Sequence, residues 1–206
     1  MVELNVISLS RKFGKKIVLN DLTFSSTAQV IGIAGSNGSG KSTLLRTLSG
    51  LLKPTAGHVR WKIDQQEIEP IKLRSYMGFT APYIELYEEL TVQENLEFII
   101  KARGESDLSC MNNTLQQLDS TDLLQQFYGS LSTGQRQRIK LAAALIHKPR
   151  ILFLDEPGSN LDSKGIQTVN DIINHFKGPK NMVIIASNLK QELDLCDQII
   201  ELKNIE

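Results

Sequence analysis

The feature that most constrains this chain is a glycine-rich stretch between an apolar segment and an amphipathic one. Gly35 and Gly40 are separated by four residues and followed directly by Lys41 and Ser42. This spacing is typical of a loop whose backbone N–H groups surround phosphates, because glycines let the chain turn tightly without Cβ clashes. We expect Lys41 to reach the terminal phosphates and the Ser42 hydroxyl to ligate Mg²⁺. The complete candidate loop comprises Gly35, Ser36, Asn37, Gly38, Ser39, Gly40, Lys41, Ser42 and Thr43.

The flanking sequence predicts a strand, a loop and a helix in that order. Residues 30–34 form an apolar run that is typical of a buried strand. After the loop, leucines recur at helical spacing and would form one apolar face: Leu44, Leu48, Leu51 and Leu52. A flexible Gly/Ser turn is the alternative, but it does not account for the agreement of strand, loop and helix. The stretch therefore predicts binding of a nucleoside triphosphate.

Composition excludes several classes of protein. The 206 residues, 41% of them apolar, are enough for one α/β domain with a subdomain. Basic and acidic residues number 23 each, which argues against bulk nucleic acid or an acidic membrane as the main partner. Cys110 and Cys196 lack a metal-like spacing, and a reduced pair is favoured over a disulfide. Neither a signal peptide nor a membrane span is expected, which predicts a soluble, intracellular protein.

The pattern along the chain predicts a mostly parallel sheet with an antiparallel β portion near the N-terminus. The all-apolar runs at 151–154 and 182–185 are typical of parallel strands that are covered on both faces. The expected strands are residues 2–9, 17–24, 30–34, about 59–61, 75–79, 151–154, 182–185 and 198–202.

A helical subdomain is expected to be inserted in this sheet, at about residues 83–147. The core would then comprise about 1–82 and 148–206 of a single domain. Capping-box patterns at Thr91 and Ser132 each open an expected helix. Further helical pattern covers residues 107–128, 163–176 and about 189–195.

Two acidic residues follow the apolar run at 151–154. Asp155 at the tip of such a strand is placed to help hold Mg²⁺ beside Ser42, and Glu156 to polarise an attacking water as general base. The alternative is that two acids simply end a strand and cap the next element. The presence of the phosphate loop favours the catalytic interpretation.

Three segments in this order resemble the ABC-type ATPases. They are residues 35–43, residues 131–135 (Leu-Ser-Thr-Gly-Gln, similar to the LSGGQ signature) and residues 154–157 (Leu-Asp-Glu-Pro). The resemblance covers essentially the whole chain, with Thr133 in place of a signature glycine.

The resemblance implies that two subunits stack head to tail, with ATP between the phosphate loop of one and the signature of the other. Ser132 would offer a hydroxyl at a helix N-terminus, and the N–H groups of Gly134 and Gln135 would face the γ-phosphate. A helix cap alone is the simpler interpretation of Ser132 and Gln135, and the two roles are compatible.

Two further positions can be placed by the resemblance. Phe13 matches the aromatic residue that stacks on adenine, although a single aromatic residue in a loop more often has a packing role. Residues 158–162 match the loop that follows the Mg²⁺-binding strand at the dimer interface, with Asp162 retained and Asn160 where glycine is usual.

The chain departs from the family pattern at two catalytic positions. Pro82 stands where a Gln usually contacts Mg²⁺ or the attacking water, and either Tyr83 or Glu85 could substitute. Asn188 stands where His is usual; it can donate an amide hydrogen bond to the γ-phosphate but carries no charge. A cationic contact is worth ~1–3 kcal/mol, so we expect slow hydrolysis with Glu156 as the base.

The leading functional prediction is an ATP-binding and ATP-hydrolysing subunit of a membrane transporter. Its expected partners are separate multi-span permease subunits and a second ATPase subunit, at the cytoplasmic face of a membrane, with no nucleic acid. The short chain and residues 48–57 are similar to small exporter-type subunits, including haem-exporter ATPases. A soluble ABC ATPase of translation or DNA repair, and a slow regulatory subunit of a heterodimer, are the alternatives. The sequence leaves open the transported substrate, the direction of transport and the choice between homodimer and heterodimer.

Overall fold

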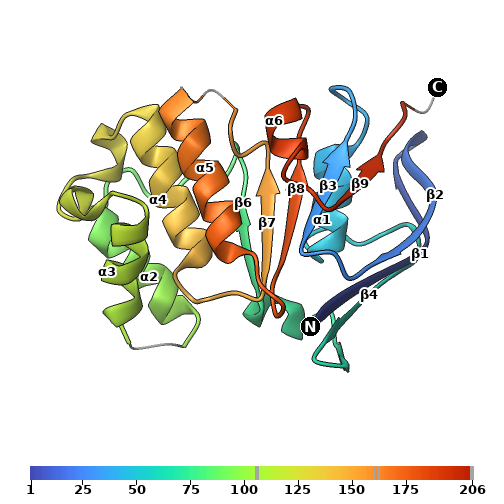
Figure 1. Ribbon diagram of the computed structural model, residues 1–206, viewed down its shortest axis with the longest axis horizontal. Helices are drawn as coiled ribbons and strands as arrows, with labels where there is room; N and C mark the ends of the chain where they lie inside the picture. The colour runs from blue at the N-terminus through green and yellow to red at the C-terminus, as the bar shows by residue number, and fades with distance from the viewer. Residues whose placement is uncertain (105–106, 160, 162, 205–206) are drawn as a thin grey trace.

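Two β-sheets form the framework of the computed structural model, which describes residues 1–104, 107–159, 161 and 163–204 (Figure 1). The antiparallel sheet has the order β2-β1-β4-β5, with β1 (Val2–Phe13), β2 (Lys16–Ser26), β4 (Ala56–Ile63) and β5 (Gln66–Ile68). In the second sheet every pair is parallel, in the order β6-β7-β8-β3-β9. Its strands are β3 (Val30–Ala34), β6 (Met77–Thr80), β7 (Ile151–Asp155), β8 (Met182–Ala186) and β9 (Gln198–Glu201).

The helices are distributed unequally around the parallel sheet. In Figure 1 the antiparallel sheet and α1 lie on one side of it, and α2, α3, α4 and α5 lie on the other. The helices are α1 (Lys41–Leu48), α2 (Val92–Ala102), α3 (Ser109–Gln117), α4 (Thr133–Leu145), α5 (Ser163–Phe176) and α6 (Lys190–Leu193). Short 3₁₀ turns are η1 (Lys72–Ser75), η2 (Thr121–Leu123) and η3 (Tyr128–Ser130). This arrangement confirms the predicted α/β class with an antiparallel N-terminal portion.

The parallel sheet is buried on both faces because its strands alternate between two hydrophobic clusters. Phe153 and Ile184 face the cluster that contains α1 and the antiparallel sheet. Leu154 and Ile185 face the cluster that contains α2 to α5. This alternation explains the all-apolar runs in the sequence, since a strand covered on both faces has no solvent-facing side.

The helix after the glycine-rich loop is shorter than predicted. It ends at Leu48, so Leu51 lies outside it and is 51% exposed. Gly50 adopts a positive φ of 74°, and the Leu52 N–H donates to the Arg46 carbonyl across this turn. A left-handed glycine that closes the last carbonyls in this way ends a helix, so Gly50 was the local signal that the leucine periodicity concealed.

The predicted helical stretch at 107–128 is also mostly irregular. Only α3 is an α-helix there, and 3₁₀ turns follow it. The chain turns at Asp119, whose φ is +49°. In addition, the predictions did not include β5. The division into a core and a helical subdomain stays a prediction.

The described helices include none that is both long enough and apolar enough to cross a membrane.

Candidate nucleotide-binding site

The glycine-rich loop joins β3 to α1 and is fixed by its glycines. Gly40 is the residue before α1, and its backbone has a φ of 102°, which residues other than glycine rarely adopt. A Cβ on Gly35 would lie 2.5 Å from the Ser39 hydroxyl oxygen and 2.7 Å from the Leu202 carbonyl oxygen. The loop is therefore closely packed between the sheet and the chain after β9.

The ammonium group of Lys41 lies against this loop. Its side chain is only 4% exposed, and its Nζ donates to the carbonyl oxygens of Gly35 at 2.9 Å and Ser36 at 3.1 Å. Two neutral acceptors do not neutralise the ammonium group. A positive charge is therefore present beside the loop before any anion binds.

Ser42 and Asp155 meet where α1 begins and β7 ends. The Ser42 hydroxyl donates to Asp155 Oδ1 at 2.9 Å, and the buried Asp155 Oδ2 has no hydrogen-bond partner among the described residues. Burial raises the pKa of Asp155; the Ser42 hydrogen bond opposes this rise and the charge of Glu156 adds to it. A hydroxyl and an unpaired carboxylate oxygen are hard donors that fit Mg²⁺. The site therefore fits the predicted ion, although no cluster of three His, Cys, Asp or Glu side chains occurs in the described part of the chain.

Glu156 follows Asp155 in a left-handed backbone conformation, with a φ of 45°. Its N–H donates to the Ala186 carbonyl of β8 at 2.8 Å, which fixes the turn at the edge of the sheet. The side chain lines the same pocket as Lys41 and Ser42, whose volume is about 480 Å³. It also lines a neighbouring cavity that contains Asn188. Glu156 thus lies between the phosphate loop and the end of β8.

Asn188 contacts the phosphate loop, and its predicted hydrogen bond to the γ-phosphate stays a prediction. Its exposed side chain donates from Nδ2 to Asn37 Oδ1 at 3.3 Å. The preceding residue, Ser187, is 1% exposed, and its N–H donates to the Ile33 carbonyl at 3.1 Å. The strand end is thus anchored, while the amide group at its tip remains accessible.

Glu192 is a buried acid beneath this edge that the sequence analysis did not identify. It lies in α6, is fully buried, and accepts a hydrogen bond from the Gly158 N–H at 2.8 Å. Burial raises the pKa of Glu192, and hydrogen bonds from Ser187 and Gly158 oppose the rise. It therefore links the loop after Glu156 to the strand end before Asn188. No local pattern in the sequence distinguishes Glu192 from an exposed helical acid.

The predicted signature segment forms a capped helix start. Ser132 accepts a hydrogen bond from the Gln135 N–H at 3.4 Å, and Gln135 Oε1 accepts one from the Ser132 N–H at 2.9 Å. A Cβ on Gly134 would meet nothing within 4 Å, so this position faces open space. Two residues after Gln135, Gln137 donates to the Pro157 carbonyl at 2.9 Å. The predicted capping box is confirmed, and the helix contacts the loop beyond Glu156.

Within one chain, the signature segment and the phosphate loop line different pockets. One pocket contains Lys41, Ser42 and Glu156, and the other contains Ser132 and Thr133. The two pockets have no lining residue in common. The chain therefore brings the catalytic acids to the phosphate loop but not to Ser132.

Phe13 lies at the end of β1, which extends beyond the predicted strand 2–9, rather than in a loop. Its ring is 47% exposed, and the Arg11 guanidinium lies 4.5 Å from the ring centroid. Lys16 and Val18 of the next strand line the phosphate-loop pocket. Neither residue was predicted as part of the site, because neither belongs to the glycine-rich motif in the sequence. Asn160 and Asp162, which the resemblance placed at a dimer interface, lie outside the described residues.

The segment after β6 distinguishes the two proposed substitutes for Gln at the position of Pro82. Glu85 accepts hydrogen bonds from Lys140 Nζ at 2.6 Å and from the Tyr128 hydroxyl at 2.9 Å. The Tyr83 hydroxyl instead accepts one from Arg46 Nε of α1 at 2.9 Å. Glu85 is therefore hydrogen-bonded to residues of η3 and α4, next to the signature segment, whereas Tyr83 is hydrogen-bonded to α1.

Comparisons with known proteins agree with this geometry. Residues 19–159 match the family model described as "ABC transporter". The chain is 32% identical over 200 residues to the uncharacterized ABC transporter ATP-binding protein YdbJ of Bacillus subtilis (strain 168), covering 96% of this chain and 65% of YdbJ. It is 30% identical to YybJ of the same organism, covering 98% of this chain and 93% of YybJ.

A solved structure shares the fold. It is titled "Structure of ATP binding subunit of ABC transporter" and superposes with a TM-score of 0.84 at 26% identity, covering 98% of this chain and 86% of that one.

Proposed function

The chain belongs to the ABC transporter family, and we propose that it is the ATP-binding subunit that powers one such transporter by hydrolysing ATP. The observation that carries this proposal is the pocket that Lys41, Ser42 and Glu156 line together, with Asp155 hydrogen-bonded to Ser42. These groups supply a cation for phosphates, hard oxygen donors for a metal and a base for water.

Each residue has a distinct role in the proposed reaction. Lys41 binds the terminal phosphates, and the loop N–H groups surround them. Ser42 and Asp155 would hold Mg²⁺, which when bound would neutralise developing charge on the phosphate oxygens. Glu156 accepts a proton from the attacking water, and Asn188 donates an amide hydrogen bond toward the γ-phosphate.

The signature segment acts on a nucleotide that is bound to a second ATPase subunit. Three features support this role: the exposed start of α4 at Ser132 and Thr133, the open space at Gly134, and the separation of the two pockets. Head-to-tail pairing would place Ser132, Gly134 and Gln135 of one subunit against the phosphate loop of the other. In this arrangement Phe13 stacks on the adenine ring.

We further propose that separate multi-span membrane subunits carry the substrate and that this chain works at their cytoplasmic face. ATP-driven closure of the dimer would be transmitted to them as a change in subunit arrangement. The similarity to haem-exporter subunits stays a hypothesis about the substrate, supported by residues 48–57 alone.

Purification of the tagged chain from membranes tests the transport role. We expect a multi-span membrane protein to copurify, and the complex to hydrolyse ATP. Copurification with ribosomes or DNA instead would reject the transport role and favour the soluble class of ABC ATPase.

A further inference from the structure

The segment that follows β6 brings a tyrosine to α1, the helix that begins at the phosphate loop. β6 runs parallel to β7, with Thr80 paired to Leu154, so the residues after Thr80 emerge beside Asp155 and Glu156. Pro82 has no polar side chain, but the next residue does. We propose that the Tyr83 hydroxyl donates a hydrogen bond to the bound triphosphate, on the side where Ser42 and Asp155 would hold Mg²⁺. This inference rests on the proposed ATPase function.

The position of Tyr83 is fixed by the same helix that carries Ser42. Arg46 lies four residues after Ser42, one helical turn further along α1. Its Nε donates to the Tyr83 hydroxyl at 2.9 Å, and its guanidinium lies 4.4 Å from the centroid of the Tyr83 ring. Two contacts to one side chain restrict both the direction of the ring and the position of its hydroxyl. The hydroxyl is therefore held by a side chain that lies one helical turn after Ser42.

The Tyr83 hydroxyl still has its own proton to donate. It accepts from Arg46, and its hydrogen has no acceptor among the residues that the structure describes. Burial raises the pKa of Tyr83 above its ordinary value; the charge of Arg46 opposes this rise, and the charge of Asp155 adds to it. The phenol is therefore protonated at neutral pH. The ring is 52% exposed, so a ligand can reach it.

Glu85, the other polar neighbour of Pro82, cannot take this role. Both of its carboxylate oxygens are engaged, one by Lys140 and one by Tyr128. These partners lie in η3 and α4, which precede and follow the start of the signature segment. Tyr83 is thus the residue after β6 whose polar group is directed to α1.

The test is the substitution Tyr83→Phe, which removes the hydroxyl and keeps the ring against Arg46. Affinity for ATP is measured by titration calorimetry with Mg²⁺ and with EDTA, alongside steady-state phosphate release. We expect the gain in affinity that Mg²⁺ provides to fall roughly five- to ten-fold, with affinity in EDTA unchanged, because one hydrogen bond to charged oxygens is lost. Phosphate release should fall by a similar factor.

Tyr87→Phe is the matched control. Tyr87 is 55% exposed, and its ring packs edge-on against Phe98 rather than against α1. It should match wild type in both measurements, and thermal unfolding should show that both variants fold.

The possible failures are distinguishable. If the wild-type chain neither binds nor hydrolyses ATP, the proposed function fails. If the wild-type chain does both and Tyr83→Phe retains the full Mg²⁺-dependent gain, only the role of Tyr83 is rejected. Equal losses of affinity in Mg²⁺ and in EDTA would also reject it, because they would indicate a general effect on the loop.

Discussion

At the phosphate-loop edge (residues 35–43, 155 and 156) the functional groups directly follow or precede buried parallel strands, whereas at the signature face (residues 82–85 and 132–140) they lie in the turn after β6 and in the first turns of α4. β3 and β7 have no exposed residue along their lengths. The signature face depends instead on the capping box at Ser132 and on the ion pair of Lys140 with Glu85, whose side chain is 50% exposed. Side chains at the ends of buried strands have few alternative positions, whereas partly exposed ion pairs can break and re-form.

This difference suggests a division of labour. The phosphate-loop edge is organised before nucleotide binds, because Lys41, Ser42 and Asp155 already contact each other or the loop. The signature face is positioned by side-chain contacts to partly exposed groups, such as Lys140 with Glu85 and Arg136 with Glu88, and we expect it to adjust more readily than the sheet. A rigid binding edge with an adjustable partner face suits a machine that closes on ATP and opens after hydrolysis.

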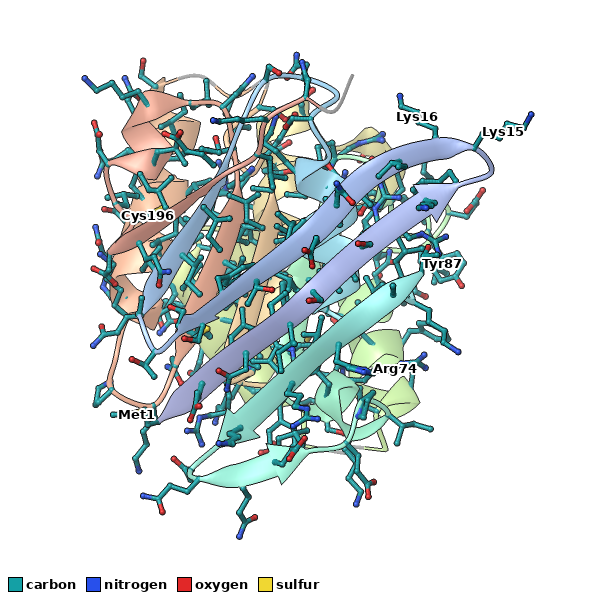
Figure 2. All side chains as sticks on the ribbon, turned by 90° about the vertical axis from the view of Figure 1, so that its right-hand side faces the viewer. Met1, Lys15, Lys16, Arg74, Tyr87 and Cys196 are labelled. Carbon is teal, nitrogen blue, oxygen red and sulfur yellow. The ribbon has the colours of Figure 1, made fainter. Side chains whose placement is uncertain are left out.

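The largest expected effect belongs to the rigid edge. Lys41→Ala removes its cation and should weaken ATP binding by roughly 100-fold, about 3 kcal/mol, because a charge-assisted contact to phosphate is lost. Titration calorimetry measures this change. Lys15→Ala is the control, since Figure 2 shows Lys15 at the tip of the β1–β2 hairpin. Equal ATP affinity of Lys41→Ala and wild type would place the phosphates elsewhere.

The second prediction concerns the attachment of the signature helix at low pH. His147 follows α4, and its Nε2 lies 2.9 Å from the Met77 carbonyl oxygen of β6. Burial, together with the charge of Arg103, lowers the pKa of His147 from 6.5 to about 4, and the Met77 contact opposes this. His147 therefore binds a proton more tightly in the unfolded chain than in the folded one. The stability that comes from burying the neutral ring is lost as the pH falls from 6.5 toward 4.

The size of that effect is at most about 3 kcal/mol. Denaturant unfolding at several pH values should show a shallower loss of stability for His147→Asn than for wild type in this range. His58→Asn, which changes an exposed ring, should follow the wild-type profile. Identical pH profiles for wild type and His147→Asn would contradict the assignment.

The third prediction separates the two regions directly. Lys140→Met removes the pair with Glu85 and the 3.3 Å contact to the Pro82 carbonyl, without leaving a buried charge behind. We expect a loss of about 1–2 kcal/mol in unfolding free energy and a several-fold fall in phosphate release, with ATP affinity unchanged. Lys101→Met, which breaks an exposed pair with Glu97, is the control. A parallel fall in ATP affinity would show that the two regions are not separable.

The smallest effect is expected at the end of β8. Asn188→His would restore a group that can carry charge beside the phosphate loop, and turnover should rise roughly three- to ten-fold. Steady-state phosphate release measures this. The absence of any gain would mean that the edge is adapted to asparagine.

The sequence predicted those parts of the molecule that local patterns decide. The phosphate loop, the strand before Asp155 and the capping box at Ser132 each depend on neighbours within a few residues, and each lies where it was predicted. The helix over residues 163–176 was predicted at its observed bounds for the same reason.

The remaining features depend on contacts that are distant in the sequence. The pairing of Tyr83 with Arg46, and the burial of Glu192 beneath Gly158, follow from the sheet order and from no local signal. The helix after the phosphate loop was predicted too long for a different reason. The apolar periodicity continues to Leu52, although Gly50 ends the helix.

The most direct test of the account is steady-state phosphate release by Glu156→Gln, with ATP affinity measured in parallel. Glutamine preserves the shape of the side chain at the left-handed position after β7 but cannot accept the proton of the attacking water. We expect the rate to fall by at least roughly 100-fold while ATP affinity stays within a few-fold of wild type. An unchanged rate of phosphate release would show that Glu156 is not the base.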